Sequence, residues 1–111
     1  MKIEGKNYKI PEINVKTIAE LEKYGVYILY NEYKSVLTLI SGFICITAHV
    51  SQEESYKIIE KQYLSGNGIN EWLEDINNAL EVSEFVKQII NKPKPKNSVF
   101  KFAFKNGSEL E

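Results

Sequence analysis

The residue types best suited to nucleophilic or metal chemistry are scarce in this chain, which has one cysteine, Cys45, and one histidine, His49. The two lie four residues apart, so on a helix they would share one face. A cysteine–histidine pair needs a third, orienting group and a site for an oxyanion, and the sequence indicates neither. One thiol and one imidazole also fall short of the four ligands of a zinc site. We therefore interpret Cys45 as a core thiol and His49 as a residue near the end of an apolar helix, and we expect no metal site.

The carboxylates and the glycine-rich segment form no catalytic pattern either. Acidic residues are numerous, but most fall on predicted helix surfaces or first turns, where capping and solubility explain them. The segment 65–68, Ser-Gly-Asn-Gly, lacks the Lys-Ser/Thr ending of a phosphate-binding loop and is expected to break a helix. The sequence therefore predicts a protein that is not an enzyme and that needs no cofactor.

Composition bears on nucleic acid, membranes and compartment. The 111 residues include no arginine and have a formal net charge of −1, which disfavours nucleic acid, because the guanidinium group is the preferred reader of phosphate and guanine. The longest apolar run, 36–50, is too short and too polar to cross a bilayer. A single cysteine and the absence of a signal-peptide pattern lead us to expect a cytoplasmic protein.

The first part of the chain predicts a hairpin and a helix. Residues 2–10 read as a β-hairpin in which Gly5 takes a positive φ. A helix is expected to begin after an N-cap at Asn14 and to end at Gly25. The apolar stretch 26–30 fits a short strand, a helical turn or a buried connector equally well.

Three more helices are expected downstream. Residues 36–50 read as a helix buried on most sides, with a buried strand as the alternative, and Gly42 indicates close approach of another helix. Ser51 and Glu54 have the spacing of a capping box. Beyond the 65–68 break, an amphipathic helix either bends near Ser83 or is followed by a new helix that Ser83 caps, and the helices on either side of the break should form an antiparallel helical hairpin.

The last part of the chain differs in composition. Residues 91–97 form a Pro/Lys linker, followed by Phe100, Phe102 and Phe104 at alternate positions, which would share one face of a strand. By count, residues 1–90 carry 9 lysines and 13 acids (−4), and 91–111 carry 5 lysines and 2 acids (+3). We expect this strand to pair with the 2–10 hairpin of its own or a neighbouring chain, the alternative being a tail without fixed structure. The fold class is thus mainly α: a small helical domain over 1–90 with an N-terminal β-hairpin, and a linker and aromatic tail with a C-terminal strand over 91–111.

Tyrosines recur at intervals of three between the first and second predicted helices, at Tyr24, Tyr27, Tyr30 and Tyr33. Gly25 interrupts any continuous helical stripe. The tyrosines fit either packing of a partly buried connector or a partner-binding surface, since tyrosine is favoured in interfaces. The candidate residues for partner binding or self-association are therefore Tyr27, Tyr30, Tyr33, Phe100, Phe102 and Phe104.

The order of these elements over residues 1–90 resembles the tail assembly chaperones of long-tailed, siphovirus-like bacteriophages and prophages. The resemblance lies in the hairpin Ile3-Glu4-Gly5-Lys6-Asn7-Tyr8-Lys9-Ile10, the helix ending Thr17-Ile18-Ala19-Glu20-Leu21-Glu22-Lys23-Tyr24-Gly25, the apolar central helix, the Ser51-Gln52-Glu53-Glu54 start, the Gly66-Asn67-Gly68 break and a last helix around Phe85. It implies a non-catalytic cytoplasmic protein that binds the tape measure protein, after which tail tube protein is recruited. It also implies self-association into a homo-oligomer. The alternatives are a small DNA-binding regulator, an enzyme using Cys45 or His49, and another phage structural or connector protein.

Overall fold

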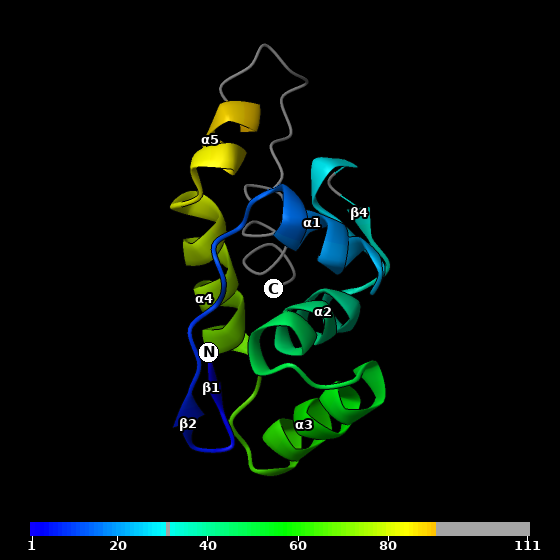
Figure 1. Cartoon of the computed structure of the whole chain (residues 1–111). Coiled ribbons are helices and arrows are strands. Elements are labelled where there is room, and N and C mark those ends of the chain that lie inside the picture. Colours follow the sequence, from blue (N-terminus) through cyan, green and yellow to red (C-terminus); the bar gives the residue numbers. More distant parts are fainter. Residues whose placement is uncertain (31, 91–111) are drawn as a thin grey trace.

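The computed structural model describes residues 1–30 and 32–90, which form a mainly helical unit with a small N-terminal β-hairpin (Figure 1). The elements in chain order are β1 (Lys2–Ile3), β2 (Lys6–Asn7), α1 (Val15–Glu22), β3 (Val26–Tyr27), the 3-10 turn η1 (Ile28–Tyr30), β4 (Glu32–Tyr33), α2 (Val36–Ala48), α3 (Gln52–Leu64), α4 (Asn70–Glu81) and α5 (Glu84–Ile90). The predicted fold class is confirmed for this part of the chain. The predicted linker and C-terminal strand, 91–111, lie outside the described residues.

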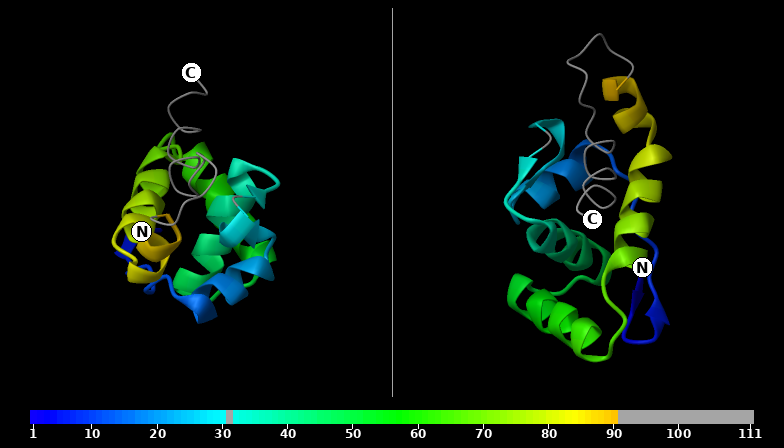
Figure 2. Two further views of the ribbon diagram at one scale, coloured as in Figure 1. Left: turned by 90° about the horizontal axis from the view of Figure 1, so that it is seen from above. Right: turned by 180° about the vertical axis from the view of Figure 1, so that it is seen from behind.

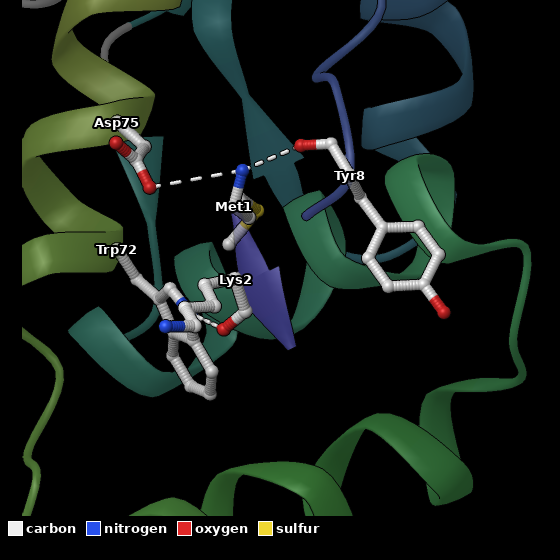
Figure 3. A network of polar contacts seen from close by, with 5 residues as sticks. All are labelled: Met1, Lys2, Tyr8, Trp72 and Asp75. Carbon is white, nitrogen blue, oxygen red and sulfur yellow. Dashed lines mark hydrogen bonds and ion pairs between the residues drawn. The ribbon is translucent and has the colours of Figure 1, made fainter. Parts of the chain in front are cut away.

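The N-terminal hairpin is fastened to α4. Antiparallel β1 and β2 are two residues long each. The indole N–H of Trp72 donates to the carbonyl of Lys2 at 2.9 Å, and the Met1 ammonium donates to the carbonyl of Tyr8 at 2.6 Å (Figure 3). The same ammonium lies 3.7 Å from the Asp75 carboxylate. The contacts of Lys2 with Trp72 and of Met1 with Asp75 join residues some seventy positions apart and fix the hairpin against α4.

Side-chain caps set the starts of four described helices. The side-chain oxygens of Asn14, Ser35, Ser51 and Ser83 each accept a hydrogen bond from the backbone N–H three residues on, at 3.0–3.1 Å. The predicted caps at Asn14 and Ser51 are thus confirmed. The cap at Ser83 decides that α5 is a separate helix. Gly25 has the expected left-handed φ of 89°, but α1 already ends at Glu22, so the predicted helix end was three residues too late.

Helix α2 is the centre of the core, and residues 39–47 are all buried. The helical reading of this run is confirmed, although α2 ends at Ala48, two residues before the predicted end. Gly42 explains how closely α2 approaches the segment after α1: a Cβ at this position would lie 2.9 Å from Cγ2 of Val26. On another side of α2, the hydroxyls of Ser41 and Ser55 are hydrogen-bonded at 2.5 Å, which brings α3 close.

The expected antiparallel hairpin of α3 and α4 is not formed. Buried Ser55, Ile58 and Ile59 face the core from α3, whose main packing partner is α2, and α4 stands across the end of α3 rather than alongside it (Figures 1 and 2). Gly66 and Gly68, both with positive φ, let the chain turn sharply between the two helices. Of the described helices, none alone has the length and apolar content to cross a membrane; α2 and α3 reach them only together, bent by 111°.

Candidate protein-binding surface

The ambiguous stretch after α1 folds into a second hairpin, made of β3, η1 and β4. Its strands pair Val26 with Tyr33 and Tyr27 with Glu32. Val26 and Ile28 are buried in the core, where β3 and η1 pack on α1 and β3 and β4 pack on α2. These anchors alternate with the outward positions 27 and 29, and the hairpin lies at the edge of the molecule (Figure 1).

Large side chains on this hairpin face solvent. The exposed fractions are 39% for Tyr27, 43% for Leu29 and 69% for Tyr30, and Leu37 in the first turn of α2 is 46% exposed. We call these four residues, Tyr27, Leu29, Tyr30 and Leu37, the tyrosine hairpin surface. Solvent-facing tyrosine and leucine on an anchored scaffold are typical of a protein-binding site, because they offer apolar area at little cost in side-chain entropy.

The structure separates the tyrosines that the sequence grouped by their spacing. Tyr27 and Tyr30 are exposed, whereas Tyr24 and Tyr33 are half-buried and pack against the core. The four tyrosines at intervals of three therefore do not form one face: two rings pack against the core and two face solvent. Phe100, Phe102 and Phe104, the other predicted partner-binding residues, lie outside the described residues.

Two members of the surface, Leu29 and Leu37, were missed from the sequence. Leu29 falls in an apolar run without a period, and Leu37 precedes the buried part of α2, so each resembles a core residue. A signal was available for Leu37. Ser35 is a good N-cap, and first-turn residues just behind a cap often remain exposed when the buried face begins later in the helix.

The Cys45 thiol has the hydroxyls of Ser55 and Ser41, and not the imidazole of His49, as its side-chain hydrogen-bond partners. His49 is the C-cap of α2 with a left-handed φ of 59°, so it is exposed just beyond the helix, whereas Cys45 is buried within it. Both line a cleft of about 300 Å³ together with Glu20 and Lys23. Burial raises the pKa of the Cys45 thiol, although hydrogen bonds with serine hydroxyls act in the opposite direction. A thiol that stays protonated is a poor nucleophile.

A cleft of about 700 Å³ lies between the N-terminal hairpin, the end of α3 and the start of α4. Two of its polar side chains have partners beside the cleft: the Lys61 ammonium is 3.2 Å from the Glu4 carboxylate, and the Gln62 side-chain amide donates to the carbonyl of Gly68 at 2.9 Å. Within residues 1–30 and 32–90, no group of three or more His, Cys, Asp or Glu side chains is placed to hold a metal ion.

A second set of exposed apolar residues lies on α3, namely Tyr56, Tyr63 and Leu64. Helix α3 carries five charged residues, so these side chains are interspersed with solvated charges along the helix. The β3–β4 hairpin, by contrast, carries one charged residue, Glu32, between positions 26 and 33. The hairpin is therefore the better candidate for an apolar contact.

No family model, no curated protein and no solved structure matches this chain.

Proposed function

We propose that this protein is a tail assembly chaperone of a phage or prophage, which binds the tape measure protein in the host cytoplasm and supports tail tube assembly without catalysing a reaction. The observation that carries the protein-binding part is the tyrosine hairpin surface. The class of client comes from the family resemblance in the order of elements over residues 1–90.

The chemistry of the surface suits such a client. A tape measure protein is long and aggregation-prone, and its helical segments expose apolar faces before the tail tube encloses them. Tyrosine rings cover apolar side chains while their hydroxyls stay hydrated. This combination favours a reversible contact between chaperone and client. An amphipathic client helix can place its apolar face against the exposed side chains of the hairpin, Tyr27, Leu29 and Tyr30.

The charges near the surface favour a protein over a phosphate backbone as the partner. Between positions 27 and 37, which carry the surface, the charged residues are Glu32 and Lys34, so the surface has no excess of positive charge. Binding to nucleic acid draws most of its affinity from cations placed against phosphates. A DNA-binding regulator would need such cations on its contact face, so this surface does not suit that alternative.

Co-expression tests the proposal. The full chain is produced together with the tape measure protein encoded in the same gene cluster, and the soluble, co-purifying fraction of the tape measure protein is measured. We expect the wild-type chain to raise this fraction and the double variant Tyr27→Ser/Tyr30→Ser to lose the effect, because both exposed rings are removed while the buried anchors stay.

The matched control is Tyr56→Ser/Tyr63→Ser, which removes two exposed tyrosines from α3 instead. This variant is expected to behave as the wild type does. A tape measure protein that stays insoluble with the wild-type chain and does not co-purify contradicts the proposed function. If both double variants raise the soluble fraction of the tape measure protein as the wild type does, the proposed function stands. The tyrosine hairpin surface is then rejected as the contact.

A further inference from the structure

An apolar groove lies between the connector after the N-terminal hairpin and the end of α4. Its volume is about 480 Å³. Its lining residues are Lys9, Ile10, Pro11, Glu12, Ile13, Ala79, Val82 and Ser83. Val82 is 71% exposed, although it stands beside the buried Ile13 and Ser83, so the groove presents apolar side chains to its opening.

One wall of this groove is an extended backbone with unused hydrogen-bonding groups. The connector is held at one end, where the Thr17 hydroxyl donates to the carbonyl of Glu12 and the Ser83 hydroxyl donates to the carbonyl of Ile13, each at 2.5 Å. Within the described part of the chain, residues 9–11 make no backbone hydrogen bond. A fixed, unpaired and extended segment is a template for an added strand.

Carboxylates outnumber cations at the groove. Glu12 and Lys9 both stand in the groove wall, and Glu81 is the neighbour of Val82. Farther along the helices, Asp75 of α4 is paired with the Met1 ammonium and Glu84 of α5 with Lys87, so the carboxylates that an occupant meets are Glu12 and Glu81. An occupant that combines apolar side chains with positive charge therefore fits this site on both counts.

We propose that residues 99–105 of this same chain dock into this groove as an added strand along residues 9–11. The segment reads Val-Phe-Lys-Phe-Ala-Phe-Lys, so its three phenylalanines share one face, and residues 91–111 carry a net charge of +3. The phenylalanines cover Ile10, Ala79 and Val82, and the lysines lie near the carboxylates of Glu12 and Glu81. Strands β1 and β2 are two residues long each, so they offer the three phenylalanines less apolar surface than the groove does.

The chain is long enough to make this contact with itself. Helix α5 starts directly after Ser83 in the groove wall, and its seven residues extend about 10 Å. The eight residues 91–98 span up to about 26 Å when extended, which covers the return. Because the segment is tethered, its local concentration at the groove is on the order of millimolar, which favours the same chain over a second copy.

Paramagnetic broadening in NMR spectra of the full chain tests this docking. A nitroxide label is attached at Ala103→Cys in a Cys45→Ala background, because position 103 is on the face opposite the phenylalanines. We expect loss of the amide signals of Ile10, Ala79 and Val82 in the labelled chain. The signals of Tyr56 and Tyr63 on α3 should remain.

Two variants of the labelled chain serve as controls. Phe100→Ser/Phe102→Ser/Phe104→Ser removes the apolar face of the segment, and Val82→Lys places a repelling charge at an exposed position of the groove. Both are expected to restore the lost signals. Signals that stay lost in both variants contradict docking through the phenylalanines.

A mixed sample identifies the occupant. Chain that carries the nitroxide but no nitrogen-15 is mixed with nitrogen-15-enriched chain that carries no nitroxide. Any broadening of the observed signals then comes from a second copy of the chain. The proposal predicts unbroadened signals in this mixture. Broadening at the groove only in the mixture makes a second copy the occupant, and intact signals in both samples mean that the groove is empty; either result overturns the proposal.

Discussion

Gly42 is the described glycine at which an added Cβ would meet its nearest neighbour at the shortest distance. A Cβ there would stand 2.9 Å from Cγ2 of Val26, a side chain that is itself fully buried and cannot move aside. Alanine gains up to about 1 kcal/mol over glycine in helix propensity, but overpacking costs about 1–3 kcal/mol, so overpacking wins. We expect Gly42→Ala to lower the free energy of unfolding by about 1 kcal/mol in urea titrations.

A second background makes this expectation sharper. In a Val26→Ala chain the clashing methyl is gone while the propensity gain stays, so Gly42→Ala is expected to be neutral or stabilising there. The sign of the Gly42→Ala effect thus depends on Val26. Equal losses in the two backgrounds would show that the Val26 contact does not set the cost.

Cys45 gives the protein a pH dependence rather than a reactive group. Burial raises the pKa of this thiol, so the folded protein holds the proton more tightly than the unfolded chain does. The contribution of the thiol to stability is complete below the unfolded pKa, about 8.5, and is lost as the pH rises from there through the folded pKa. We therefore expect the wild type to lose stability relative to Cys45→Ala above that pH. Urea unfolding of both proteins from about pH 6 to about pH 10, in steps of about one pH unit, measures the difference. A wild-type stability that stays constant or rises relative to that of Cys45→Ala over this alkaline range would contradict a raised pKa.

At the scale of elements, the caps are the features that local sequence determines most directly. The Ser51 hydroxyl accepts from the N–H of Glu54 at 3.1 Å and is exposed, so its loss leaves an orphan donor without opening a cavity. We expect Ser51→Ala to cost about 1 kcal/mol of unfolding free energy, and Ser51→Asp to keep the wild-type value, since aspartate caps equally well. The same loss in both variants would mean that the hydroxyl contributes something other than a cap.

The caps at Asn14 and Ser51 and the glycine break after α3 could be predicted because each depends on residues within one turn. The β3–β4 hairpin could not, since its strands are two residues long and its inward positions, Val26 and Ile28, are indistinguishable from Leu29 in an unbroken apolar run. The pairing of helices could not be predicted either. The apolar stripe of α3 predicts that one face of this helix is buried. It does not predict that this face packs against α2.

The exposed residues of the candidate surface differ in how far the sequence indicated them. Tyr27 and Tyr30 were predicted from their spacing and type, whereas Leu29 and Leu37 depend on which way the chain turns after α1 and on where the burial of α2 begins. The structure confirms the predicted positions of Cys45 in the core and of His49 at the end of the apolar helix. Their assignment to one helical face failed at His49, because its left-handed backbone ends the helix first.

At the scale of the whole molecule, the tyrosine hairpin surface and the apolar groove lie on different sides. The β3–β4 hairpin projects beyond α1 and α2, while α4 and the connector that form the groove stand on the other side of those helices (Figures 1 and 2). A client on the hairpin therefore leaves the groove open to the C-terminal segment. The two proposed contacts can be made at once, and each can fail without the other.

Amide hydrogen exchange locates the client directly on the folded chain. The full-length protein is measured alone and in its co-purified complex with the tape measure protein. Slower exchange is expected for the amides of residues 26–30 and 32–37 in the complex, with α3 amides around Tyr56 and Tyr63 unchanged. A complex in which exchange slows elsewhere and stays unaltered through the β3–β4 hairpin would contradict binding by the tyrosine hairpin surface.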